Sequence, residues 1–169
     1  MKHHALHMYD YHVWANQRIL KHLKELPQEI YSQEIKSGSS VSNMLLHIYQ
    51  TDTLWLSVMN GDSFEEIMVV VNRLSEETKA KVIEEMETKF LDISQRYKEF
   101  FDCQKDLDIT VSCEHPHFGR LETKLSQLVQ HVVNHGTYHR GNITTILREL
   151  GHPSVSMDYI VYLYEMDKK

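Results

Sequence analysis

Apolar residues recur at intervals of three and four along several long stretches of the chain, a pattern typical of amphipathic helices. The first such stretch covers residues 4–25, and Pro27 closes it because proline cannot continue a helix. The second covers residues 41–60 and ends at Gly61, a residue suited to the left-handed conformation that follows many helices. The pattern therefore predicts two helices in the first third of the chain.

Two further long helices and a hairpin are predicted in the remainder. The third helix is expected to begin near Ser75, a good N-cap residue, and the fourth is expected from Thr123 to Gly151. Between them, residues 107–113 alternate roughly, Pro116 and Gly119 are turn residues, and residues 118–122 are expected to pair back as in a β-hairpin. A short helix or loop is expected at the end of the chain. The expected core positions of the third helix are Val82, Met86, Phe90, Ile93, Tyr97 and Phe100.

The composition agrees with a compact helical fold. The chain has 169 residues, of which 41% are hydrophobic and 25% are charged, and it has only 6 Gly and 3 Pro. These values are ordinary for a globular domain, and so few chain breakers favour long helices. We therefore expect one all-α domain over residues 1–169, a four-helix bundle with a short β-hairpin before the last bundle helix.

Charge and cysteine content narrow the range of partners. The formal net charge is −6, and no block of basic residues is present, so nucleic acid is not an expected partner. No apolar run approaches the roughly 20 residues needed to cross a bilayer, so no membrane association is expected. The two cysteines, Cys103 and Cys113, are too few for a disulfide framework and are expected to be inert. A cytoplasmic location is the simplest expectation.

Histidines occupy apolar positions on two of the predicted helices. On the fourth helix, His135 and His139 continue a stripe of leucine, valine and isoleucine residues, and His131 lies at its margin. On the second helix, His47 is likewise expected to point inward, because it lies in line with Met44, Thr51, Leu54 and Val58. A buried polar group without a partner costs about 1–3 kcal/mol, so three such imidazoles require something to satisfy them.

A divalent metal ion would satisfy these histidines. Side chains at positions i and i+4 of a helix lie about 5–6 Å apart and can bind one ion. His135 and His139 have this spacing, and His47 from a neighbouring helix would complete a three-histidine set with one coordination position open, as in catalytic zinc sites. Imidazole also suits Ni, Fe, Cu and Mn, so the metal stays open. The alternative is that these are core histidines hydrogen-bonded to backbone or to Asp52 and Tyr138.

Other polar residues are candidates for contact with a ligand of the metal or with substrate. Asn16 and Asp52 are candidates for orienting a ligand of the metal. Arg140 is expected to be a surface salt-bridge partner, with contact to an anionic substrate as the alternative. No glutamate follows His135 directly, so the zinc-protease motif is absent. Five histidines on or before the first helix are expected to face solvent: His3, His4, His7, His12 and His22.

Three sequence elements resemble those of one family. The run His131-Val-Val-Asn-His135-Gly-Thr-Tyr-His139-Arg140-Gly-Asn-Ile is similar to the signature on the last bundle helix of the DinB (DinB/YfiT-like) family. The segment Trp14-Ala-Asn16 resembles the Trp-x-Asn element of its first helix, and Leu45-Leu-His47 resembles the Leu-x-His of its second. Asn142 departs from the glutamine that is common there.

The resemblance implies a four-helix bundle, usually a homodimer, with a divalent metal ion bound by His47, His135 and His139. Well-understood relatives transfer low-molecular-weight thiols such as bacillithiol or mycothiol, or isomerise maleylpyruvate with such a thiol. The leading hypothesis is a metal-dependent enzyme that transfers a thiol to an electrophilic small molecule. A metal-dependent hydrolase and a non-catalytic metal-binding protein of the stress response are the alternatives.

Overall fold

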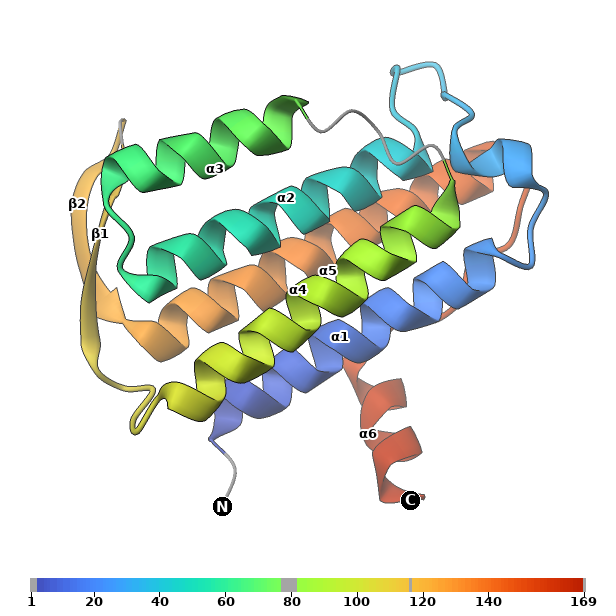
Figure 1. The fold of residues 1–169 in the computed structure, drawn as a ribbon. Helices are drawn as coiled ribbons and strands as arrows, with labels where there is room; N and C mark the ends of the chain where they lie inside the picture. The colour runs from blue at the N-terminus through green and yellow to red at the C-terminus, as the bar shows by residue number, and fades with distance from the viewer. Residues whose placement is uncertain (1–2, 77–81, 116, 169) are drawn as a thin grey trace.

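Four long helices form a bundle in the computed structural model, which describes residues 3–76, 82–115 and 117–168. They are α1 (His4–Leu23), α2 (Val41–Asn60), α4 (Ile83–Cys103) and α5 (Leu125–Glu149), and they lie alongside one another (Figure 1). Helix α1 packs against α5, α5 against α2, α2 against α4, and α4 against α1. This closed ring places α1 and α2 at opposite corners of the bundle.

Smaller elements surround the bundle. Helix α3 lies along the outer side of α2, and α6 packs against α1 (Figure 1). The antiparallel hairpin pairs Thr110 with Lys124 and lies across the end of the bundle where α2 ends and α5 begins. None of the described helices is long and apolar enough to cross a membrane. The bounds of the smaller elements are Gln28–Tyr31 (a 3-10 helix), Phe64–Glu76 (α3), Thr110–His115 (β1), Gly119–Lys124 (β2) and Tyr159–Asp167 (α6).

Local signals define the ends of α2. The Ser40 hydroxyl accepts a hydrogen bond from the backbone N–H of Asn43, as expected of a serine N-cap. Gly61 follows the helix with φ of 80°, a left-handed conformation that glycine adopts without steric cost. Helix α2 therefore has the bounds that the sequence predicted.

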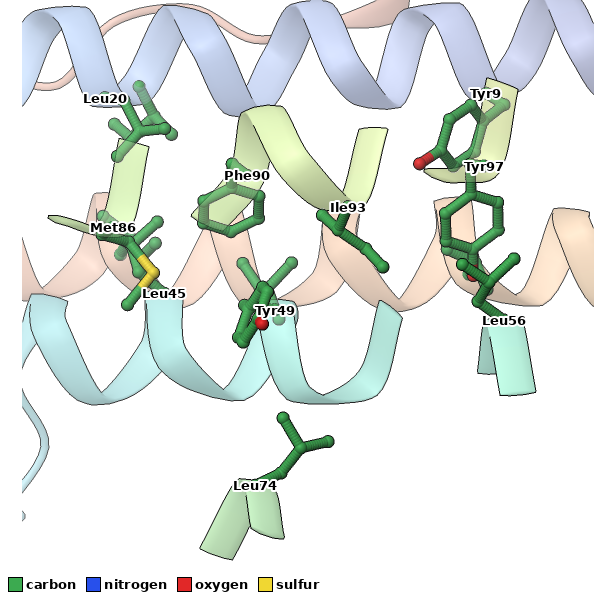
Figure 2. Close-up of a cluster of buried hydrophobic side chains, with 14 of the residues drawn as sticks. Tyr9, Leu20, Leu45, Tyr49, Leu56, Leu74, Met86, Phe90, Ile93 and Tyr97 are labelled. Carbon is green, nitrogen blue, oxygen red and sulfur yellow. The ribbon is translucent and has the colours of Figure 1, made fainter. Parts of the chain in front are cut away.

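The core lies where the bundle helices face one another. Helix α4 contributes five of its six predicted core residues as buried side chains, while Val82 is only partly buried and precedes the helix. Figure 2 shows α4 residues Phe90 and Ile93 between α1 and α2, with Leu74 of α3 covering the outer side of α2. The four-helix bundle and the hairpin before its last helix are thus confirmed.

The third predicted helix begins later than expected. Ser75 belongs to the last turn of α3, and α4 begins at Ile83 after Val82, which provides no side-chain cap. The sequence prediction missed α3 as a separate helix. Residues 77–81 lie outside the described residues.

The predicted buried face of α2 was also wrong by about one residue. The predicted stripe ran through His47, Leu54 and Val58, yet these side chains are partly or well exposed. Helix α2 is largely apolar because α3 covers it from outside while α4 and α5 pack on its inner sides, so apolar residues alone do not mark its innermost face. The buried face consists of Val41, Leu45, Ile48, Asp52, Leu56 and Met59, with Tyr49 and Thr53 beside it.

Candidate metal centre

Three histidines from α2 and α5 meet at one point of the bundle. His47 lies on α2, and His135 and His139 lie one turn apart on α5, the helix that packs against α2. Each ring offers a nitrogen that lies within 4.8 Å of those offered by the other two. The Nε2 atoms of His47 and His135 are 3.1 Å apart, and the ring centroids of His47 and His139 are 4.4 Å apart. The structure therefore brings together the three residues selected from the sequence.

These rings lie at the margin of the core, which corrects the expectation that they point into an apolar interior. His47 is exposed, and His135 and His139 are partly exposed. The face of α5 that points to the centre of the bundle passes through Gly136 and Arg140. The triad consequently lies between α2 and α5 on a side that small molecules can reach.

The surroundings of the triad favour neutral rings. Burial lowers the pKa of His135 to about 4, and the nearby rings of His139, His47, His131 and His12 contribute to that shift. Burial also lowers the pKa of His139, with a further contribution from His47, and burial lowers that of His47 itself. Neutral imidazole presents a nitrogen lone pair, which is the form that binds metal ions.

Among the described residues, the three rings make no hydrogen bond to backbone, Asp52 or Tyr138; their polar contacts join His47 to His135 and Asn142 Nδ2 to His139 Nδ1 at 3.4 Å. The Nδ1 atom of His135 is buried and has no hydrogen-bond partner among the described residues. Asp52, proposed as a partner in the alternative interpretation, bonds to His12 instead. Tyr138 packs edge-on against the His139 ring at 4.9 Å between centroids, with 68% of its own surface exposed. The donor set fits a metal ion better than it fits packing.

A second group of polar residues fills the centre of the bundle, and we call His12, Asn16, Asp52 and Arg140 the central cluster. Each is at most 3% exposed. His12 was expected to face solvent, and Arg140 was expected on the surface, so both predictions were wrong. Asn16 and Asp52 are buried in this cluster, where they contact His12 rather than the three rings of the triad. The spacing of His12 four residues before Asn16 was the sequence signal that it shares the buried face of α1.

The remaining candidates lie away from the triad or at its edge. His131 is exposed one turn before His135, and its ring meets Trp55 at 4.7 Å between centroids. His4 is exposed as expected, whereas His22 Nε2 lies 2.8 Å from the backbone oxygen of Pro153. Cys103 and Cys113 are not disulfide-bonded, and burial raises the pKa of Cys113, so it has little thiolate character.

The fold and the site together define a class of small helical bundle with a histidine triad between two neighbouring helices. Comparisons with known proteins agree with this class. The sequence profile of the DinB family matches residues 1–168. The chain is 46% identical over 161 residues to Protein DinB of Bacillus subtilis (strain 168), covering 95% of this chain and 94% of that protein. This chain therefore belongs to the DinB family.

A solved structure supports the fold independently of close sequence similarity. The crystal structure of a DinB-like protein from Bacillus cereus ATCC 10987 superposes with a TM-score of 0.66. The match covers 90% of this chain and 94% of that one at 19% sequence identity. The bundle architecture is thus shared across distant sequences.

Proposed function

We propose that this protein is a divalent-metal-dependent enzyme whose ion is held by His47, His135 and His139. The convergence of these three rings carries the proposal. Zn–N bonds of about 2.0–2.1 Å place the nitrogens of a tetrahedral site about 3.4 Å apart. The separation of 3.1 Å between the Nε2 atoms of His47 and His135 is close to this value, and the nitrogens that the three rings offer all lie within 4.8 Å of one another.

The exposed side of the triad supports a catalytic role. Three protein ligands are typical of catalytic zinc sites, which keep a further position for water or substrate. His47 is exposed, so a small molecule can approach the three rings from solvent. A divalent ion bound there would lower the pKa of a thiol or of water and so supply a nucleophile at neutral pH. Zn, Ni, Fe and Mn are the candidate metals.

The reaction that we propose is transfer of a low-molecular-weight thiol, such as bacillithiol, to an electrophilic small molecule. With a chloromethyl electrophile the thiol sulfur forms a bond to carbon, chloride leaves, and the thiol proton goes to solvent. Hydrolysis by activated water is the second candidate, because the same exposed site would accept water. Membership in the DinB family supports both proposals. If neither reaction occurs, the alternative is a non-catalytic metal-binding protein of the stress response.

Metal binding is tested by elemental analysis and thermal melts with and without a chelator. At an ion concentration of about 100 times Kd, linkage predicts about 2.7 kcal/mol of stabilisation. For a protein of this size that stabilisation corresponds to a rise in Tm of about 5–11 °C. His139→Ala is expected to abolish the rise. His131→Ala is the matched control on the same helix and is expected to retain it. A wild-type protein that binds no divalent ion would refute the proposal.

Catalysis is tested with bacillithiol and monochlorobimane, whose conjugate is fluorescent. We expect turnover by the metal-loaded wild type, loss of turnover in His139→Ala, and retention in His131→Ala. Bound metal without transfer to any electrophile would favour the non-catalytic alternative. The homodimer implied by the family resemblance stays a prediction, and sedimentation velocity tests it.

A further inference from the structure

The central cluster joins three of the bundle helices, α1, α2 and α5, at one point. His12 of α1 reaches across the bundle to α2, where its Nε2 lies 2.9 Å from Asp52 Oδ2. On the other side of the ring, its Nδ1 lies 3.3 Å from Nη1 of Arg140 on α5. Tyr97 of α4 lies beside the cluster without belonging to it, and its hydroxyl donates to the backbone oxygen of Asp52 at 2.9 Å. Helices α1 and α2 occupy opposite corners of the bundle, so the contact between His12 and Asp52 crosses the middle of the core.

The His12 ring has polar partners at both of its nitrogens. A guanidinium has donors only, so Nδ1 must accept from Arg140. On the other side of the ring, Nε2 lies 2.9 Å from Oδ2 of Asp52, an acceptor when the carboxyl group is ionised, and 3.0 Å from Nδ2 of Asn16, a donor. One imidazole thus links a buried anion to a buried cation, and Asn16 Oδ1 accepts a further bond from Arg140 Nη1 at 2.7 Å. We call the chain of contacts Asp52–His12–Arg140 the buried bridge.

The buried bridge ends on the two helices that carry the triad, beside the triad itself. Asp52 follows His47 on α2 by little more than one turn, and Arg140 follows His139 directly on α5. The His12 ring packs on Gly136, the residue after His135, so closely that an added Cβ there would lie 2.3 Å from Cε1. The bridge therefore connects α2 and α5 close to the turns that bear the three histidines.

Stability alone does not explain the central cluster, because parts of it reduce the free energy of unfolding. Asp52 Oδ1 and Arg140 Nε are buried without a hydrogen-bond partner among the described residues. Buried ion pairs are often no more stabilising than well-packed apolar residues, and buried polar atoms without partners reduce stability. Because the cluster lies beside the three histidines, its unfavourable contribution to stability indicates that it positions the helices that carry them.

We propose that His12 and Asp52 are positioning residues for the metal centre. They hold α2 and α5 at the separation that lets His47 share an ion with His135 and His139. This inference rests on the proposed function. Neither residue contacts the ion; each acts through the helix backbone, so loss of the bridge weakens metal affinity and alters coordination geometry.

The test compares Asp52→Asn and His12→Gln with wild type and with Tyr97→Phe. Tyr97→Phe removes one buried hydrogen bond from the same region and leaves the bridge intact, so it controls for lost stability. The Kd for Zn²⁺ is measured by competition with a chromophoric chelator, and the visible spectrum of the Co²⁺-loaded protein reports coordination geometry. Circular dichroism establishes that each variant is folded, and TMAO is added to all samples if a variant is marginal.

We expect Asp52→Asn and His12→Gln to raise the Kd and to shift the Co²⁺ bands, with the roughly 10–100-fold loss found for residues that hydrogen-bond a metal ligand as the upper limit. Tyr97→Phe is expected to keep the wild-type Kd and spectrum. Folded bridge variants with wild-type affinity and spectrum would overturn this inference while leaving the metal centre intact. An equal loss of Zn²⁺ affinity in Tyr97→Phe would also overturn it, because general loss of folding stability would then explain the weaker binding. A wild type without metal affinity would instead refute the proposed function.

Discussion

The two helical glycines of α5 offer a direct measurement of how closely His12 packs. Replacement of a glycine in a helix interior by alanine is expected to stabilise the helix by about 0.5–1 kcal/mol. At Gly141 an added Cβ meets no atom within 4 Å, so this gain should be realised in full. At Gly136 the same Cβ would lie 2.3 Å from His12 Cε1 and 2.9 Å from Arg140 Nη1. Atoms in van der Waals contact do not approach so closely, so the buried ring must move.

The cost at Gly136 has two parts. Overpacking a buried site costs about 1–3 kcal/mol. Displacement of His12 also strains its contacts to Asp52 and Arg140, and a buried polar group left without a partner costs about 1–3 kcal/mol. After subtraction of the gain in helix propensity, we expect Gly136→Ala to lose about 3 kcal/mol and Gly141→Ala to gain up to about 1 kcal/mol.

Calorimetry of the metal-free variants measures the difference. For a protein of this size 1 kcal/mol shifts Tm by about 2–4 °C, so Tm should fall by about 6–12 °C in Gly136→Ala and rise by up to about 4 °C in Gly141→Ala. Urea unfolding gives the corresponding free energies. A Gly136→Ala protein as stable as wild type would show that His12 is not held against α5, and the packing described for the central cluster would be wrong.

Two further predictions follow from the pKa shifts. Because the pKa of His135 is lowered from 6.5 to about 4 in the folded state, the unfolded state binds more protons between these values, and the metal-free protein should lose stability as pH falls through this window. The full shift corresponds to about 3 kcal/mol of unfolding free energy, which solvent screening of the partly exposed ring reduces to about 1–2 kcal/mol. A His135→Asn variant whose stability has the same dependence on pH as the wild type would contradict this prediction. Burial also raises the pKa of Cys113, whereas Cys103 is exposed, so iodoacetamide near neutral pH should modify Cys103 faster. Peptide mass spectrometry follows both sites, and faster labelling of Cys113 would disprove the assignment.

Periodicity predicted the bundle because each long helix has one dominant apolar face. It failed on α2, where α3 covers the outer side and makes a second face apolar. It also missed α3, since the capping signal at Ser75 suggested the start of a helix that begins at Ile83. Apolar periodicity indicates which residues are covered, and it does not indicate by which neighbour.

The triad was predicted from the sequence because its members break an apolar pattern at helical spacing. The central cluster was not predicted, because a charged side chain is almost never fully buried without partners. Thr137 is a local partner of Arg140, but its other two side-chain partners come from a distant segment. Asn16 and His12 lie more than one hundred residues before it in the chain. Only the folded arrangement shows that these residues satisfy one another.

Helix α2 carries a solvent-facing polar residue and a buried polar residue on different faces. His47 faces solvent, while Asp52 faces the interior and takes part in the network that joins the helices. A change of donor at position 47, for example to Asp or Cys, would alter the preference for hard or soft metals without disturbing any interior contact. A scaffold with this division can acquire new chemistry by exchange of a few outer side chains, because its folding free energy resides elsewhere.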